Sequence, residues 1–307
     1  MVDTFTVGVV GARGHTGGEL IRILNDHPYI EVVFAGSREL AGKPVSSVEG
    51  LTYENLSPED MARRDQDAVF LALPDGIGEK WVGAVSDDTV IIDISADHRF
   101  TDEWVYGLPE LFREKIKGAR RIANPGCYAT ALQLGVAPFV EDLGGIPTVF
   151  GVSGYSGAGT TPSPRNDPEN LADNLIPYRL TGHNHEREGT LHLGHTVRFM
   201  PHVHPAFRGL LVTAHMPLKE PTKPEDAYAK LVSTYDGEPL VHVQEEIPTL
   251  KDGTGLTGVL IGGTTVSGDG LGLTVVAAED NLLKGAAVQA VQNLNLALGL
   301  PETSGIL

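Results

Sequence analysis

Cys127 is the only cysteine among the 307 residues of the sequence, and it directly follows an Asn-Pro-Gly turn. An apolar helical segment begins at or beside it, which would place its sulfur at a helix N-terminus. Free backbone N–H groups and the positive end of the helix dipole stabilise a thiolate there. A lone cysteine is more often a small buried apolar residue. In this position we predict a nucleophile.

Seven of the 11 histidines fall between residues 183 and 215. We predict that His183 and His185, in the segment Thr181-Gly-His-Asn-His-Glu-Arg-Glu188, supply an acid and base for the thiolate. The His-x-His spacing, with a carboxylate from Glu186 or Glu188, leaves a metal site open as an alternative. We expect no metal here. The other histidines are expected to be surface or strand residues: His192, His195, His202, His204 and His215.

A glycine-rich turn follows the first expected strand and precedes a helical segment. It has three glycines at a spacing of three residues, Gly11-Ala-Arg-Gly-His-Thr-Gly17. Glycine lets the backbone approach a pyrophosphate, and the following helix N-terminus favours negative charge. The turn therefore predicts dinucleotide binding by Gly11, Arg13, Gly14, His15, Thr16 and Gly17.

The end of the second expected strand indicates which dinucleotide is bound. An NAD site usually has Asp or Glu at this position, where it holds the ribose 2′-hydroxyl. Here the sequence has Ser37-Arg38, followed by Glu39. A hydroxyl and a guanidinium suit a 2′-phosphate. We therefore predict NADP as the cofactor.

The elements that must hold these residues alternate between strands and helices. Short apolar runs at 4–10, 30–36, 67–74 and 89–95 predict strands, and 16–27 has helical spacing. Runs without alternation suit strands that are buried on both faces. The pattern predicts an N-terminal doubly wound Rossmann-type parallel sheet in residues 1–126.

A different pattern begins near residue 125. A long helix is expected over 127–144, followed over 148–164 by a strand that runs into a Gly/Ser/Thr/Pro-rich loop. Further strands are expected at 196–203, 210–218 and 240–246, with two more in 256–280. Residues 127–280 therefore read as a second α+β domain built on a mostly antiparallel sheet, which carries the catalytic residues. The segment 281–307 is expected to form a C-terminal helix that returns to the Rossmann domain.

Composition excludes several classes of protein. Acidic residues outnumber basic ones by 40 to 23, which gives a formal net charge of −17. This charge repels nucleic acid and anionic lipid, so we expect neither as a partner. No apolar run is long enough to cross a membrane, and the start of the chain lacks a secretory pattern. A single cysteine excludes a disulfide framework. We expect a soluble cytoplasmic protein.

Together these motifs resemble the N-acetyl-gamma-glutamyl-phosphate reductase family, the NADPH enzymes of arginine biosynthesis that are related to aspartate-semialdehyde dehydrogenase. The resemblance runs over almost the whole chain. Besides the motifs above, it is carried by Leu73-Pro74, Asp93-Ile-Ser-Ala-Asp-His-Arg99, Tyr106-Gly-Leu-Pro-Glu110, Asn124-Pro-Gly-Cys-Tyr-Ala-Thr130, Gly154-Tyr-Ser-Gly-Ala-Gly159, Arg208-Gly209 and Asp280-Asn-Leu-Leu-Lys-Gly285.

The resemblance implies the remaining site residues. Cys127 would be the nucleophile, and the acid/base would be one of His183 and His185. Cofactor contacts would include Pro74, Ser95, Gly157 and Asn281, and Asn124 would bind substrate. An anionic acyl phosphate also needs local positive charge in this acidic protein. Arg99, Arg208 and Lys284 are the candidates, while Glu188 would orient the acylamino end.

The expected reaction is the reversible reduction of a small acyl phosphate to an aldehyde through a cysteine thioester, by a homo-oligomer. Three other functions stay open. One is aspartate-semialdehyde dehydrogenase or a reductase of carrier-linked aminoadipyl or glutamyl phosphates. Acidic carriers would be repelled by a net charge of −17. The others are a metal hydrolase that uses the His-x-His pairs, and a redox-sensing nucleotide-binding regulator.

Overall fold

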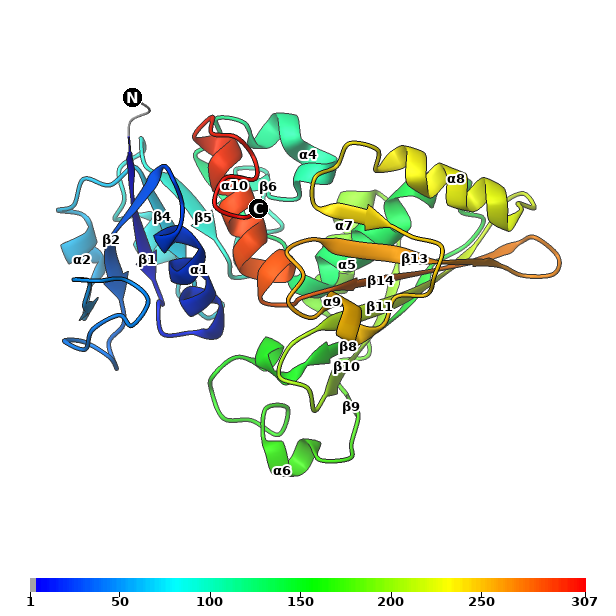
Figure 1. Cartoon of the computed structure of the whole chain (residues 1–307), viewed down its shortest axis with the longest axis horizontal. Helices are drawn as coiled ribbons and strands as arrows, with labels where there is room; N and C mark the ends of the chain where they lie inside the picture. The colour runs from blue at the N-terminus through cyan, green and yellow to red at the C-terminus, as the bar shows by residue number, and fades with distance from the viewer. Residues whose placement is uncertain (1–3) are drawn as a thin grey trace. The chain divides into compact units, whose positions relative to one another are not determined.

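The computed structural model describes residues 4–307, which divide into two compact units. The first unit comprises Met1–Gly126 and Ala286–Leu307, and the second comprises Cys127–Gly285 (Figure 1). The C-terminal helix therefore belongs to the first unit. Residues 281–285, which the sequence analysis assigns to the C-terminal segment, belong to the second unit.

The first unit is built on one parallel seven-stranded sheet in the order β3-β2-β1-β4-β5-β7-β6. The strand order reverses between β1 and β4, which is the switch point where open α/β sheets bind ligands. The predicted Rossmann-type sheet is confirmed. Its strands are β1 (Phe5–Val10), β2 (Ile30–Gly36), β3 (Tyr53–Glu54), β4 (Ala68–Leu71), β5 (Val90–Asp93), β6 (Val105–Tyr106) and β7 (Arg121–Ala123).

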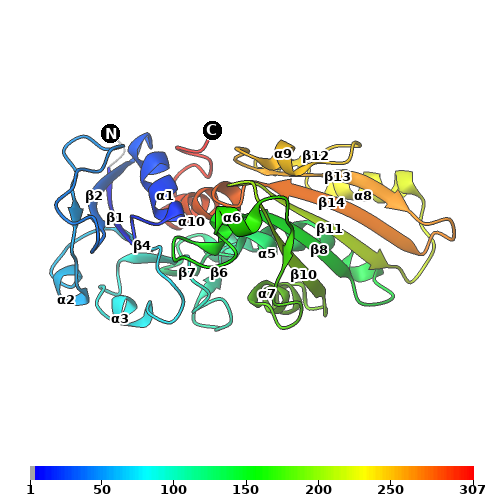
Figure 2. The same cartoon turned by 90° about the horizontal axis from the view of Figure 1, so that it is seen from below.

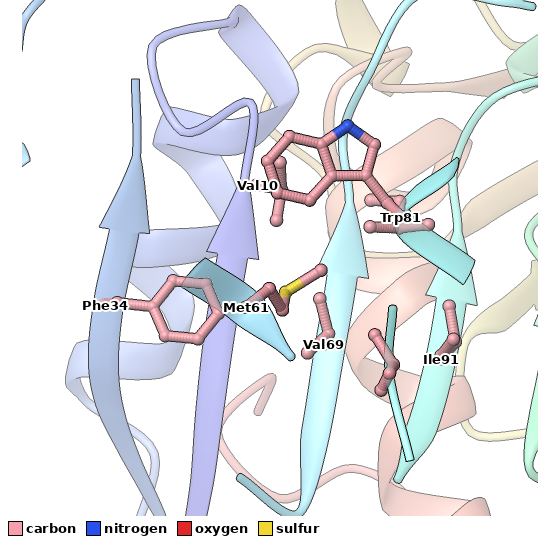
Figure 3. Close-up of a cluster of buried hydrophobic side chains, with 8 residues drawn as sticks. Val10, Phe34, Met61, Val69, Trp81 and Ile91 are labelled. Carbon is pink, nitrogen blue, oxygen red and sulfur yellow. The ribbon is translucent and has the colours of Figure 1, made fainter. Parts of the chain in front are cut away.

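Helices cover both faces of this sheet, as its continuous apolar strands require. Helices α1 and α10 lie on one face, and α2 and α3 lie on the other (Figure 2). On the second face, Met61 of α2 and Trp81 of α3 pack over Val10, Phe34 and Val69 (Figure 3). The helices are α1 (His15–Asn25), α2 (Pro58–Met61), α3 (Glu79–Val82), α4 (Pro109–Ile116) and α10 (Val288–Ala297).

The second unit contains a mixed seven-stranded sheet in the order β12-β13-β14-β11-β8-β10-β9. Four of its neighbouring pairs are antiparallel, and β8–β10 and β12–β13 are parallel. The predicted mostly antiparallel sheet is confirmed. Its strands are β8 (Thr148–Gly154), β9 (Ile176–Pro177), β10 (Arg198–His204), β11 (Leu210–Pro217), β12 (Val241–Val243), β13 (Val259–Val266) and β14 (Gly272–Glu279).

Helix α5 packs against β11 and β14 of this sheet, and α7 packs against α5. The predicted helix over 127–144 is shorter than expected. It remains α-helical only to Val136 and continues as the 3-10 helix η1, because Pro138 cannot donate the next α-helical hydrogen bond. The helices of this unit are α5 (Cys127–Val136), η1 (Ala137–Asp142), η2 (Tyr155–Ala158), α6 (Pro168–Leu171), α7 (Asn184–Leu193), α8 (Pro224–Thr234) and α9 (Leu250–Gly253).

The chain passes back to the first unit through a π-helical turn, η3 (Leu283–Ala287), which leads into α10. In the sequence this stretch reads as one helix over 281–300. A π-turn inside a helix often lies at a functional site. Within residues 4–307, no helix is both long enough and apolar enough to span a bilayer.

Candidate active site

The glycine-rich turn joins β1 to α1 at the switch point of the parallel sheet. Gly11 has φ +84°, and a Cβ on it would lie 2.0 Å from the carbonyl oxygen of Ala72, which follows β4. A Cβ on Gly17 would lie 2.5 Å from the Gly11 carbonyl oxygen. Glycine is therefore required at both positions so that the turn can pass this close to its neighbours.

Helix α1 presents an open N-terminus behind that turn. Its N-cap, Gly14, offers no side-chain hydrogen bond, and its first turn contains no acidic residue. The first N–H groups of a helix have no partner within the helix, and the dipole adds positive charge. His15 and Thr16 are half-buried in this first turn. These groups fit the pyrophosphate of a dinucleotide.

The residues after β2 fit a 2′-phosphate. The Ser37 side chain is buried and accepts a hydrogen bond from the Leu40 N–H at 3.2 Å, while Arg38 is exposed. The carboxylate of Glu39 forms an ion pair with Arg13 at 2.7 Å. The acidic residue beside the predicted site is thus neutralised by an arginine of the glycine-rich turn. The donor set suits NADP better than NAD.

The other residues predicted in this unit lie at the carboxyl edge of the same sheet. Pro74 is exposed in the loop after β4, and Ser95 is buried after β5, where its hydroxyl donates to Asp93 at 2.9 Å. Arg99 is buried and donates to the carbonyl oxygens of Ile94 and Asn124 at 2.7 and 2.8 Å. The structure brings Arg99 and Asn124 together.

Cys127 is the first residue of α5 and is half-buried. All other residues of α5 are buried, so packing fixes the helix and the thiol at its start. The free N–H groups of the first helical turn favour the thiolate over the thiol. The position is the one that the sequence predicts for this side chain.

Gly285 and Glu279 lie beside Cys127. A Cβ on Gly285 would be 2.7 Å from the Cys127 Cβ and 2.9 Å from Glu279 Oε1. Glycine is therefore needed where η3 passes the nucleophile. Glu279, at the end of β14, is completely buried, and its Oε1 and the Cys127 Cβ both border the space beside Gly285. Glu279 belongs to no sequence motif that marks it, because a carboxylate at the end of a strand has no distinctive spacing.

His183 is the N-cap of α7, and its Nδ1 accepts a hydrogen bond from the His185 N–H at 3.1 Å. Burial, followed by the charges of His185 and Arg179, lowers the pKa of His183 to about 3. His183 is consequently neutral at physiological pH. A neutral imidazole whose Nδ1 is committed to the helix cap is a poor proton donor. His183 caps the N-terminus of α7.

His185 lies within α7, and its ring centre is 4.6 Å from that of His183. Its Nε2 is 3.9 Å from Oε1 of Glu188, one helical turn later. Glu188, which the resemblance implies orients the acylamino end of the substrate, is completely buried. The ring of Tyr128, the residue after the nucleophile, is 5.8 Å from that of His185. The structure therefore brings His185 toward the start of α5.

Four further predicted residues of the second unit are held by internal contacts. Asn281 accepts a hydrogen bond from the Gly209 N–H and donates to Ser156, beside Gly157 in η2, both at 2.9 Å. Arg208 forms an ion pair with buried Asp280 at 3.5 Å. Lys284 lies in η3 and has no exposed surface.

Two further residues of this unit, Tyr178 and Arg165, belong to no recognisable sequence motif. The thiolate charge of Cys127 and, above all, burial raise the pKa of Tyr178 well above its ordinary value, so the phenol stays protonated. Its ring centre is 5.5 Å from that of His183. The guanidinium carbon of Arg165 lies 4.7 Å from the centre of the Tyr178 ring. Loop residues without helical or strand periodicity give no pattern from which these contacts could be predicted.

The five other histidines between residues 183 and 215 are all half-buried or exposed: His192, His195, His202, His204 and His215. Three of them lie on strands. His202 of β10 contacts the carbonyl oxygens of Gly151 and Met200, and His215 of β11 contacts Thr274. In the described part of the chain, no three His, Cys, Asp or Glu side chains are grouped as ligands for a metal ion.

Comparison with known proteins gives the family. The family described as "Semialdehyde dehydrogenase, NAD binding domain" matches residues 6–119, and "Semialdehyde dehydrogenase, dimerisation domain" matches residues 127–281. A curated N-acetyl-gamma-glutamyl-phosphate reductase of Xanthomonas campestris pv. campestris (strain 8004) is 51% identical over 313 residues, covering 99% of each chain. This chain belongs to the N-acetyl-gamma-glutamyl-phosphate reductase family.

A second curated member of this reductase family, from Stenotrophomonas maltophilia (strain R551-3), is 50% identical and covers 99% of this chain and 98% of its own. Solved structures share the fold. Aspartate semialdehyde dehydrogenase II of Vibrio cholerae, complexed with ASA, has a TM-score of 0.80 at 19% identity and covers 97% of this chain and 99% of its own. The corresponding Candida albicans enzyme with NADP has a TM-score of 0.72.

Proposed function

We propose that this chain catalyses the reversible, NADPH-dependent reduction of N-acetyl-gamma-glutamyl phosphate to N-acetylglutamate 5-semialdehyde and phosphate in arginine biosynthesis. The observation that carries this proposal is the 50–51% identity, over essentially the full chain, to curated reductases of that name. The placement of one half-buried cysteine at the start of α5, with His185 turned toward the same helix, supports it independently.

Cys127 would act as the nucleophile. Its thiolate attacks the acyl carbon, the new S–C bond forms, and the C–O bond to the phosphate breaks, with its electron pair leaving on the phosphate. A free carboxylate resists hydride because it already carries negative charge, whereas a thioester does not. The helix N-terminus supports the anionic sulfur before attack and again when the aldehyde leaves.

NADPH, when bound, supplies the hydride that reduces the thioester. The residues proposed to hold it are those of the glycine-rich turn and of the segment after β2, with four further residues: Gly11, Arg13, Gly14, His15, Thr16, Gly17, Ser37, Arg38, Pro74, Ser95, Gly157 and Asn281. The exposed Arg38 and the ion pair of Arg13 with Glu39 favour the 2′-phosphate form.

His185 would protonate the oxyanion that hydride transfer leaves on the former carbonyl oxygen. As the thiohemiacetal collapses, the same imidazole would take that proton back, the C–S bond would break, the semialdehyde would leave and the thiolate would be regenerated. Glu188, 3.9 Å from the imidazole and completely buried, stabilises the protonated form of His185 and fixes the ring. We therefore assign Glu188 to His185 as a positioning residue. Arg99, Asn124 and Arg208 are proposed to shape the substrate site. Arg99 would do so by holding the backbone carbonyl of Asn124, and Arg208 by pairing with the Asp280 carboxylate.

We further propose that the protein works in the cytoplasm as a homo-oligomer. The matching description of residues 127–281 as a dimerisation domain supports self-association through the second unit. Phe150 of β8 and Leu271 beside β14 are large apolar side chains that the single chain leaves exposed. Sedimentation analysis of the purified protein tests this.

The deciding experiment is phosphate-dependent reduction of NADP with N-acetylglutamate semialdehyde, followed at the NADPH absorbance. We expect turnover that requires phosphate and prefers NADP to NAD, and little with aspartate semialdehyde. Cys127→Ser should abolish turnover, because a hydroxyl without a strong base is a far weaker nucleophile. Turnover that prefers aspartate semialdehyde, or survives in Cys127→Ser, would contradict the proposal.

A further inference from the structure

Arginine 165 lies in the loop between η2 and α6 and is half-buried. Its guanidinium carbon lies 4.7 Å from the centre of the Tyr178 ring, and its side chain also hydrogen-bonds with that phenol. A planar guanidinium that stacks on an aromatic ring keeps its remaining N–H donors aimed outward in a fixed fork. These two contacts hold the Arg165 side chain against Tyr178.

A chain of ring contacts connects Tyr178 to the nucleophile. Ring centres are 5.5 Å apart for Tyr178 and His183, 4.6 Å for His183 and His185, and 5.8 Å for His185 and Tyr128. Tyr128 follows Cys127 directly in α5. The charges are also coupled, since the thiolate acts on the Tyr178 phenol and Arg165 acts on both Tyr178 and His183.

Arg179 brings a second positive charge to the same place. It follows Tyr178, and its charge also acts on His183. Its φ of +38° lies in the left-handed region, which is uncommon for a residue with a side chain. Within residues 4–307, no carboxylate lies at ion-pair distance from Arg165 or Arg179, whereas Arg208 of the same unit is paired with Asp280. Two cations without carboxylate partners among the described residues therefore act on His183 and on Tyr178, and the thiolate charge reaches Tyr178 as well.

We propose that Arg165, held against Tyr178, binds an oxyanion of the substrate beside Cys127, and that Arg179 adds to the positive field. The identity of that substrate rests on the proposed function. N-acetyl-gamma-glutamyl phosphate carries two oxyanions, the phosphoryl group and the α-carboxylate. A guanidinium binds either one through two parallel N–H donors.

The first test needs no turnover and uses the only cysteine of the chain, so alkylation has a single target. Iodoacetate and iodoacetamide share a leaving group and differ in charge, and the ratio of their rates reports the field at the thiol. One charge several ångströms away in half-buried surroundings changes that ratio by about threefold to tenfold. We expect Arg165→Gln to lower the iodoacetate-to-iodoacetamide ratio by about that factor, and Arg165→Lys to lower it less.

Arg198→Gln is the matched control, because Arg198 is an exposed arginine of the same unit at the start of β10. It should leave the ratio unchanged. Tyr178→Phe should give a smaller decrease than Arg165→Gln, since the ring remains and the hydrogen bond is lost. An unchanged ratio in Arg165→Gln overturns the inference, whatever the enzyme's substrate is.

The second test identifies the oxyanion in the oxidative direction, where phosphate and semialdehyde are separate substrates. An Arg165→Gln enzyme whose KM rises about tenfold or more for phosphate alone binds the phosphoryl group there. A rise for the semialdehyde alone identifies the α-carboxylate. No rise in either KM, with kcat also unchanged, refutes the inference. Absence of turnover in the unmodified protein would refute the proposed function instead, and the alkylation ratio would still decide the role of Arg165.

Discussion

Glu188 offers the sharpest test of how the second unit prepares its acid/base. The substitution Glu188→Gln keeps the size of the side chain and removes one charge 3.9 Å from His185 Nε2. At an effective dielectric constant of about 20, a charge pair at this distance is worth about 4 kcal/mol, which is an upper limit. If rearrangement of the surrounding protein and solvent recovers half of this energy, the protonated form of the His185 imidazole is destabilised by about 2 kcal/mol. This energy corresponds to a change of about 30-fold in its protonation equilibrium.

The assay is the pH dependence of kcat for reduction of the acyl phosphate, measured by NADPH consumption. Reduction needs a protonated His185, so a less stable imidazolium deprotonates at lower pH. We expect kcat of Glu188→Gln at pH 7.5 to fall about tenfold to a hundredfold, and the basic limb of its profile to move by about 1.5 pH units toward acid. Rates measured below that limb should approach those of the unmodified enzyme.

Glu186→Gln is the control, because it removes a carboxylate from the same helix. Glu186 accepts hydrogen bonds from the N–H groups of Gly182 and Phe199 and so serves the backbone. The Glu186→Gln substitution should therefore leave the basic limb of the kcat–pH profile at the same pH. If Glu188→Gln moves neither the limb nor kcat by more than twofold, Glu188 does not support His185, and the assignment of the acid/base is wrong.

Three further predictions follow from the described contacts. Gly11→Ala should weaken NADPH binding at least tenfold and lower Tm, because the new Cβ would lie 2.0 Å from the Ala72 carbonyl oxygen. Gly18→Ala is the control and should change neither property, because a Cβ on Gly18 would have no atom within 4 Å. Equal effects of the two variants in a cofactor titration would contradict this reasoning. Arg38→Ala should weaken NADPH binding about tenfold to a hundredfold and leave NADH binding nearly unchanged, and equal weakening of both would assign Arg38 to the fold. The pKa of His183 is lowered to about 3 in the folded chain, so below pH 6.5 the unfolded chain binds a proton at this imidazole that the folded chain does not bind. The free energy of unfolding, measured by urea titration, should therefore fall by about 2 kcal/mol from pH 7 to pH 5. The same fall in His183→Asn would contradict this prediction.

The sequence predicts the local features of the site well. The glycine spacing, the strand before it and the helix after it predict the turn at the switch point, and the structure has that turn between β1 and α1. The Asn-Pro-Gly turn and the apolar run after it predict a helix that begins at Cys127, which is where α5 begins. These features depend on neighbours within one or two turns of chain, so residue type and spacing are enough to predict them.

Several arginines and a lysine are equally good candidates for an anion site in the sequence, and only the tertiary structure shows which groups each of them contacts. Arg99, Arg208 and Lys284 read as candidates for an anion pocket, yet Arg99 donates to backbone carbonyls, Arg208 pairs with Asp280, and Lys284 is completely buried. Arg165 and Arg179 have no motif, yet both lie in electrostatic reach of His183. Whether a cation meets a carboxylate, a carbonyl or solvent depends on which segments fold against it.

The sequence by itself determined the fold class, the turn that suits a dinucleotide and the cysteine at a helix start, because each is a short-range consequence of periodicity and turn chemistry. The tertiary structure decided how the surroundings of His183 and His185 differ. Both imidazoles share one motif, but burial and the helix cap keep His183 neutral, while Glu188 stands beside His185. It also brought Glu279 beside Cys127 across 152 residues of chain, through the packing of β14 and the turn at Gly285. Burial and charge proximity are properties of the packed chain, and no local pattern encodes them.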